Sequence, residues 1–349
     1  MGIKKRVLNY LVIIIAVTVS AVFTSCGDSA SKIKITTEIG GEYYIRLAGS
    51  GVATVDWGDG SEKVSLTLNE NEGYYGRGIE FKHTYPNATI RNITISGDNI
   101  TLLCCEEITS LDVSRCTELT QLYCGRSPLT NLDVSKNKAL TVLDCSSTQL
   151  TSLDVSKNTL LAKLECSYTP LASLNVSGTA LTELKFEKTQ LTSLNVSGTT
   201  ALTKLICYNN QLTNIDVSKN TALTTLDCGS NKLTSLNIGG ATGLTMLWCG
   251  NNQLTSLDVS KNTALEKLYC YDNQLTSLDV SKNVALIHLN CIKNQLTGSA
   301  LNTLFGTLHS NSTGKFLYFG GNPGEFVCDL NIAKDRGWQA SRYQEVNRY

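Results

Sequence analysis

From about residue 100 onward, the hydrophobic positions of this chain recur with a period of 21 residues. Residues 140–160, 223–243 and 265–285 share the pattern L-x-x-L-x-C-x-x-N-x-L, followed by T-S-L-D-V-S-K-N. One such turn cannot bury its apolar side alone, whereas stacked turns share a continuous core. The pattern therefore predicts a solenoid over residues 99–298, in which the first half of each repeat forms a parallel strand beside that of the next.

This repeat resembles the leucine-rich repeat, in which two leucines, a third apolar residue and an asparagine follow one another at the same spacing. Its second half repeats the apolar rhythm and is similar to the two-strand repeats of internalin-like bacterial surface proteins. The resemblance covers roughly residues 100–325 and implies a mostly β solenoid with a parallel sheet.

Cysteine occupies one inward column of the predicted solenoid, and a single phenylalanine takes its place in one turn. Distance does not exclude disulfides between stacked cysteines, but parallel side chains about 4.8 Å apart exceed the usual Cβ separation of about 3.8 Å. Because the column accepts phenylalanine and lacks C-x-x-C pairs, we expect buried, reduced thiols and neither a metal site nor a cofactor. The column is Cys124, Cys145, Cys166, Phe186, Cys207, Cys228, Cys249, Cys270 and Cys291.

The first 25 residues have the order of a secretory signal: a basic start, an apolar run of 17 residues, and small residues before Cys26. The end of this segment resembles a bacterial lipobox, which implies that Cys26 becomes the lipidated first residue of the mature protein. A plain membrane anchor and a cleaved signal without lipid are the alternatives. Residues 26–31 then form a polar linker.

Residues 32–98 show short alternating segments separated by Gly-rich or Asn-rich turns, which predict β-strands. The motifs VDWGDGS (55–61) and FKHTY (81–85) resemble those of the PKD family, which implies a small β-sandwich with Trp57 in its core. We expect Asp56 and Asp59 to form the turn and His83 to belong to the strand motif. Calcium bound by the two aspartates is the alternative.

The repeat ends near residue 298, and residues 299–349 predict a capping region that covers the last core layer. Residues 299–310 have helical spacing, a strand and turn follow in GKFLYFGGNPG, and a last helical turn ends at Gly337. The resulting fold class is mostly β, with an α/β cap at the carboxyl end. We assign no pairing to the cysteines outside the ladder, which are Cys104, Cys105, Cys116 and Cys328.

Outward positions differ between the two halves of the repeat. In the second half they scarcely change from turn to turn, and columns of Asp and Lys predict a solvated face of balanced charge. In the first half they vary, and aromatic residues gather toward the carboxyl end, with Gly229 and Gly250 expected to leave a shallow gap beside them. We predict ligand binding there, since Trp and Tyr on a rigid sheet suit protein hot spots and sugar rings; the alternative is that aromatics merely suit strand surfaces. The candidate residues are Trp248, Tyr269, Tyr271, Tyr208, His288 and Met246.

Composition narrows the functional classes. Lys+Arg and Asp+Glu balance at 30 each, which argues against a nucleic-acid partner. The sequence contains no catalytic triad, phosphate-binding glycine loop or metal cluster, so we predict no enzyme activity. We expect a monomeric recognition protein, tethered by lipid to the bacterial cell envelope, that binds a protein; a glycan-binding lipoprotein and a passive envelope spacer are the alternatives.

Overall fold

The computed structural model describes residues 32–69, 78–311 and 314–343. The expected signal segment, the linker and the lipidated Cys26 lie outside the described residues. The described residues form one compact unit made mainly of β-strands. None of its helices is long and apolar enough to cross a membrane.

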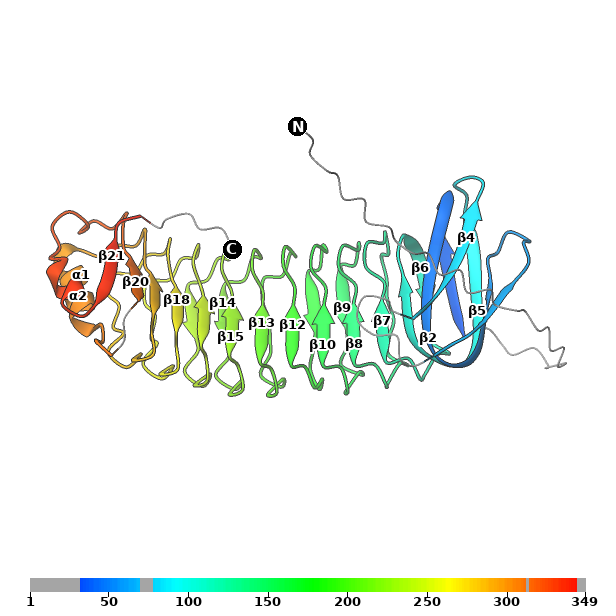
Figure 1. Cartoon of the computed structure of the whole chain (residues 1–349), viewed down its shortest axis with the longest axis horizontal. Coiled ribbons are helices and arrows are strands. Elements are labelled where there is room, and N and C mark those ends of the chain that lie inside the picture. Colours follow the sequence, from blue (N-terminus) through cyan, green and yellow to red (C-terminus); the bar gives the residue numbers. More distant parts are fainter. Residues whose placement is uncertain (1–31, 70–77, 312–313, 344–349) are drawn as a thin grey trace, which may run out of the picture. The chain divides into compact units, whose positions relative to one another are not determined.

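The first half of each repeat forms a short parallel strand, as the 21-residue period predicts (Figure 1). Each strand has a buried leucine at its centre, which pairs in register with the leucine of the next strand, from Leu122 with Leu143 to Leu268 with Leu289. The strands are β7 (Gln121–Tyr123), β8 (Val142–Asp144), β10 (Lys163–Glu165), β12 (Glu183–Lys185), β13 (Lys204–Ile206), β15 (Thr225–Asp227), β17 (Met246–Trp248), β18 (Lys267–Tyr269) and β19 (His288–Asn290).

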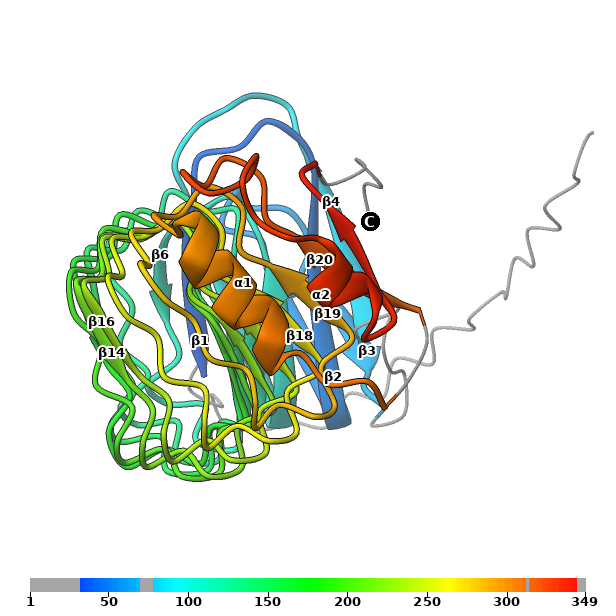
Figure 2. The same ribbon diagram turned by 90° about the vertical axis from the view of Figure 1, so that its left-hand side faces the viewer.

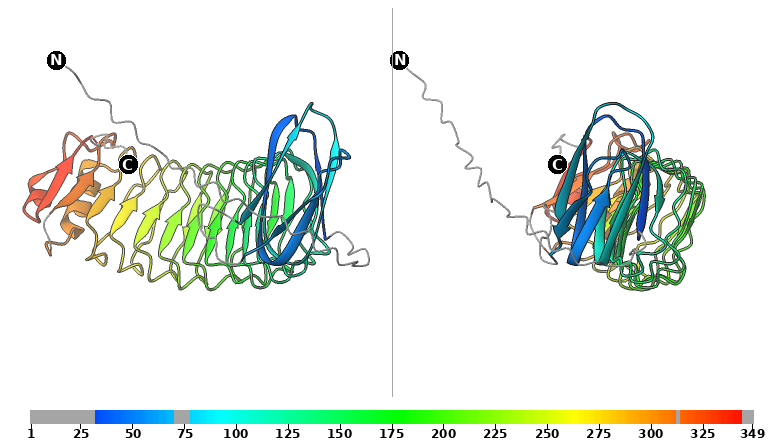
Figure 3. Two further views of the ribbon diagram at one scale, coloured as in Figure 1. Left: turned by 45° about the vertical axis from the view of Figure 1, so that its right-hand side comes forward. Right: turned by 90° about the vertical axis from the view of Figure 1, so that its right-hand side faces the viewer.

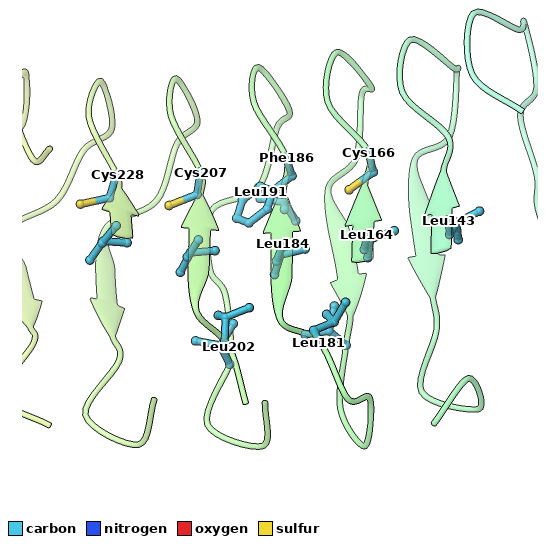
Figure 4. Packing of buried hydrophobic residues seen from close by; sticks show 14 of the residues in the cluster. Leu143, Leu164, Cys166, Leu181, Leu184, Phe186, Leu191, Leu202, Cys207 and Cys228 are labelled. Atoms are coloured by element: carbon cyan, nitrogen blue, oxygen red, sulfur yellow. The ribbon is translucent and has the colours of Figure 1, made fainter. Parts of the chain in front are cut away.

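The cysteine column lies behind this sheet and is fully buried (Figure 4). Its cysteines from Cys124 to Cys291 form no disulfides, and Phe186 takes the same buried position. Burial raises the pKa of every thiol in the column, so these cysteines remain protonated at neutral pH. The structure thus supports the prediction of an apolar column of thiols.

The second half of the repeat is less regular. It forms strands in only two pairs, β9 (Ser152–Asp154) with β11 (Ser173–Asn175) and β14 (Asn214–Asp216) with β16 (Ser235–Asn237). The Asp column is exposed, and each carboxylate accepts a hydrogen bond from the backbone N–H two residues later, as between Asp133 and Ser135 at 2.8 Å. The aspartates therefore shape the turn and face solvent.

Buried asparagines connect neighbouring turns by hydrogen bonds to the backbone. Asn252 accepts a bond from the Leu233 N–H at 3.0 Å and donates to the carbonyls of Cys228 and Cys249 at 3.1 and 3.0 Å. Each amide thus satisfies loop groups that the stacking removes from water.

The amino-terminal strands are β1 (Ile33–Thr37), β2 (Gly41–Asp56), β3 (Val64–Thr67), β4 (Ile79–Tyr85), β5 (Arg91–Cys105) and β6 (Ile108–Asp112). All of them belong to one antiparallel arrangement in which β2 pairs with β3, β4 and β5, and β1 pairs with β5 and β6. The segments EYYIRLAG (42–49) and ATVDWGDG (53–60) alternate as two separate strands would, but residues 41–56 form the single strand β2, with register shifts at Ala48/Gly49 and Ser50/Ala53. The expected boundary between residues 98 and 99 falls inside β5, whose end pairs in parallel with β7 and so continues the solenoid sheet.

The PKD-like motif residues have structural roles in this region. Trp57 is buried and stacks on the His83 ring at 5.0 Å, and Nε2 of His83 lies 2.7 Å from Oδ2 of Asp59. Asp56 and Asp59 accept bonds from backbone N–H groups two residues later, as the turn reading predicts. Among the described residues, no group of three His, Cys, Asp or Glu side chains could hold a metal ion.

The carboxyl-terminal cap covers the last turn of the solenoid (Figure 2). Helix α1 (Gly298–Thr307) buries Leu301, Leu304 and Phe305, and α2 (Asn331–Lys334) follows strand β20 (Lys315–Tyr318). A further strand, β21 (Trp338–Ser341), pairs in parallel with β20 and was not foreseen from the sequence.

Candidate functional site

The parallel strands form one continuous sheet (Figure 3), and we call the surface made by their outward side chains the varied face. On every strand these side chains flank the central buried leucine, because side chains alternate between the two sides of a sheet. The predicted site residues are half-buried on or just beyond these strands, and they are Trp248, Tyr269, Tyr271, Tyr208, His288 and Met246.

Aromatic rings follow one another across the carboxyl-terminal strands of the varied face. The Trp248 and Tyr269 rings are stacked, with centroids 5.4 Å apart and planes 3° from parallel. Tyr269 lies 4.9 Å from the His288 ring, which lies 5.3 Å from Tyr318 and 6.2 Å from Phe316. We call these five residues the aromatic strip.

Phe316 and Tyr318 belong to this strip although sequence reasoning placed them only in the cap. They flank Leu317 on β20, in register with His288 and Asn290 on β19. The signal was the segment F-L-Y, in which a leucine stands between two outward residues as it does in K-L-Y on β18, but which lies outside the 21-residue spacing.

His288 is the titratable member of the strip. Burial lowers its pKa, and the charge of Lys267 on the neighbouring strand lowers it further. Its Nε2 atom is buried and has no hydrogen-bond partner in the structure. The ring is therefore neutral at pH 7 and acts as an apolar, flat member of the stack.

Tyr208 and Tyr271 lie apart from the strip and cover two glycines. A Cβ atom at Gly250 would lie 2.6 Å from Cε1 and Cζ of Tyr271, and one at Gly229 would lie 3.4 Å from Cδ2 of Tyr208. Both glycines are buried. The expectation of a shallow gap at these glycines is wrong, because the two tyrosine rings occupy that space.

Charged side chains of β10 and β12, in the middle of the varied face, pair with one another. Lys163 and Glu183 approach within 3.5 Å, and Lys185 lies 3.1 Å from Glu165 and 3.6 Å from Glu187. These pairs offset one another's charge. Charged side chains therefore occupy one part of the varied face, and aromatic side chains occupy another.

Comparison with known proteins agrees with the stacked geometry. The family model for leucine-rich repeats in two copies matches residues 242–283. The chain is a leucine-rich-repeat solenoid. The functional domain of InlJ from Listeria monocytogenes, described as including a cysteine ladder, is similar with 34% identity and a TM-score of 0.60. That similarity covers 72% of this chain and 58% of the InlJ domain, so this leucine-rich-repeat chain spans less than two thirds of its relative.

Other solved leucine-rich-repeat structures share the fold alone. The leucine-rich-repeat domain of APL1B is 21% identical, with a TM-score of 0.50 over 66% of this chain and 70% of its own. TLR13, solved in complex with ssRNA13, is 20% identical, with a TM-score of 0.50 over 65% of this chain and 40% of its own. A search of curated proteins finds no match.

Proposed function

We propose that this protein is a non-enzymatic recognition protein of the bacterial cell surface, which binds a protein partner through the aromatic strip. The observation that carries the proposal is the continuous series of half-buried rings from Trp248 to Tyr318 on a rigid sheet. Aromatic side chains lose little conformational entropy on binding and are enriched in interface hot spots. The similarity to the InlJ domain, which also includes a cysteine ladder, supports the leucine-rich-repeat scaffold on which this proposal rests.

The orientation of the rings favours a protein partner over a glycan. Sugars bind aromatic side chains through an open ring face, but the parallel Trp248 and Tyr269 rings cover each other's inner faces. They therefore present mainly their edges, which suit the irregular apolar side chains of a protein. A glycan remains the alternative ligand, and its binding is one outcome of the test below.

The test compares a strip variant with an aromatic control outside the strip. Trp248→Ala/Tyr269→Ala removes the stacked pair, whereas Tyr168→Ala removes an exposed tyrosine from an earlier turn. The full chain and both variants would be screened against arrays of extracellular-matrix proteins and of glycans. We expect a protein ligand whose affinity falls at least about 30-fold in the strip variant, which corresponds to about 2 kcal/mol, and stays unchanged in Tyr168→Ala.

Other results would contradict this function. A ligand bound equally by all three proteins would place recognition outside the strip. A ligand found only among glycans, and displaced by free sugar, would support the glycan-binding alternative. The absence of any ligand would favour a passive spacer.

We further propose that a lipid on Cys26 holds the protein at the membrane. The lipobox-like end of the signal segment supports this attachment. Expression with an alkyne-bearing fatty acid should label the wild-type protein and leave Cys26→Ser unlabelled. Labelling of both proteins, or of neither, would contradict lipidation at this residue.

A further inference from the structure

Asp227 lies between the charged strands β10 and β12 and the aromatic strip. It is the last residue of β15, and its cross-strand neighbours are Ile206 on β13 and Trp248 on β17. The Asp227 carboxyl is half-buried between these two apolar side chains, which removes part of its hydration.

Two tyrosines approach the same position from opposite directions. The space above Gly229 and Gly250 is open to them because neither glycine has a side chain. Tyr208 reaches Gly229 of the following turn, and Tyr271 reaches Gly250 of the preceding turn. A Cβ atom at Gly229 would lie 3.4 Å from both Tyr208 Cδ2 and Asp227 Oδ1, which places the carboxylate beside that ring.

One oxygen of the Asp227 carboxylate is not bonded by the described residues and is not among the fully buried atoms that lack a partner. The other oxygen, Oδ1, accepts a hydrogen bond from the Gly229 N–H at 3.1 Å, and the described residues provide no ion pair for the carboxylate. Burial raises its pKa to about 6, and the negative charge of Glu187 contributes to the rise. Lys185, which could have neutralised this charge, is paired with Glu165 and Glu187.

We propose that Asp227, flanked by Tyr208 and Tyr271, is a surface binding site for a cationic side chain, arginine or lysine, of the protein partner. This inference rests on the proposed function in that the partner is a protein that binds the varied face. A carboxylate gives a cation a charge-assisted hydrogen bond, and adjacent rings add cation–π attraction. Arginine suits this site best, because its planar guanidinium can donate to the second oxygen of Asp227 while it packs on a tyrosine ring.

The distance between Asp227 and the aromatic strip also indicates which residues the partner segment should carry. Trp248 is the cross-strand neighbour of Asp227, about 4.8 Å away by the usual strand spacing. The partner segment should therefore carry a basic residue directly beside an apolar or aromatic one. Arginine and aromatic residues are the types most enriched among interface hot spots, which makes this combination effective.

The experiment uses a fluorescein-labelled peptide of alternating arginine and glycine, with a glutamine–glycine peptide as the uncharged probe. Anisotropy at low salt would measure binding to the full chain, to Asp227→Asn and to Asp258→Asn, an exposed aspartate of the second half-repeat. We expect Asp227→Asn to bind the arginine peptide at least about 10-fold more weakly, the range for a hydrogen bond between charged groups, and Asp258→Asn to bind it normally. The glutamine peptide should not bind.

Acid should produce the same loss in the wild-type protein. The groups around the Asp227 carboxylate are the tyrosines Tyr208 and Tyr271 and the carboxylate of Glu187. Protonation of Asp227 below about pH 6 should release the peptide from the wild type, whereas the residual binding of Asp227→Asn should not share this midpoint.

Several results would contradict the proposal that Asp227 binds a cationic side chain. These are equal binding by wild type and Asp227→Asn, equal weakening by Asp258→Asn, and no binding at all. A chitosan oligosaccharide that binds through Asp227 while the peptide does not would assign the site to an amino sugar instead. Each of these leaves the proposed function standing, because that function fails separately, when no protein ligand depends on the aromatic strip.

Discussion

Replacing Asp227 with asparagine should stabilise the protein at neutral pH and leave its stability unchanged in acid. The folded state raises the pKa of this carboxyl from 3.8 to about 6, chiefly through burial. A raised pKa means that the folded protein binds the proton more tightly than the unfolded chain does. Stability contributed by the protonated form is therefore complete below about pH 4 and is lost as the pH rises toward 6.

The magnitude follows from that shift. About two pKa units correspond to about 3 kcal/mol, and residual exposure of the half-buried carboxyl reduces the expected effect to about 1–2 kcal/mol. Asparagine keeps an oxygen that can accept the bond from the Gly229 N–H and carries no charge. We therefore expect Asp227→Asn to gain about 1–2 kcal/mol at pH 7.5 and almost nothing at pH 4.

Urea denaturation of wild type and variant at both pH values would measure this difference. Asp258→Asn is the matched control, because hydrogen bonds from Ser260 lower the pKa of that carboxyl and its replacement should not stabilise at pH 7.5. An equal gain at both pH values would show that shape or propensity, and not ionisation, is responsible. No gain at pH 7.5 would refute the claim that the Asp227 charge destabilises the fold.

Three further predictions concern the scaffold. Gly178 has a φ of 75° and lies in the turn between Cys166 and Phe186, which are 20 residues apart where other ladder positions are 21 apart. Gly178→Ala should therefore cost about 1–2 kcal/mol in thermal or urea unfolding, whereas Gly198→Ala, with open space around it, should be neutral or slightly stabilising; equal effects would contradict this account. The ladder thiols, such as Cys228, should resist maleimide in the native protein and react after unfolding, as mass spectrometry would show; rapid native labelling would contradict their burial. Asn252→Ala should lower the free energy of unfolding by about 2–4 kcal/mol, because the Leu233 N–H and the Cys228 and Cys249 carbonyls lose their hydrogen-bond partner. A loss below about 0.5 kcal/mol would show that water replaces the amide.

The periodic part of the fold could be predicted from the sequence because each turn repeats the same solution. Leu143, Leu226 and Leu268 occupy equivalent positions, so one correct assignment determines the strand, the core column and the outward positions in every turn. The cysteine column could be interpreted for the same reason, since Phe186 shows which environment the position offers.

Errors in the predictions fall where the repeat gives no second copy to compare. Residues 42–49 and 53–60 were expected as two strands, but the residues between them lie at a register shift inside the continuous strand β2. Phe316 was missed because 28 residues separate it from His288 (316 − 288), since α1 lies between β19 and β20. The positions of such segments depend on tertiary packing, which no local pattern records.

The glycines beside Tyr271 show a second reason why the site could be predicted only in part. Gly229 and Gly250 were correctly singled out as positions without side chains, but the sequence does not tell which neighbouring ring leans into the space. That orientation decides the chemistry, because it turns an expected gap into a ring-flanked environment for Asp227.

Stability and binding should respond to Asp227 in opposite directions, and this opposition distinguishes a binding role from a structural one. Asp133 and the other aspartates of its column accept a turn N–H and face solvent, and the hydrogen bonds from Ser135 lower the pKa of Asp133. Asp227 accepts the same kind of bond from the Gly229 N–H, but it is half-buried between Ile206 and Trp248, and burial raises its pKa, so its charge has a cost that a neutral residue would avoid. If Asp227→Asn is more stable at pH 7.5 and still loses the arginine peptide, unfolding cannot explain the loss, and the carboxylate is retained for what it binds.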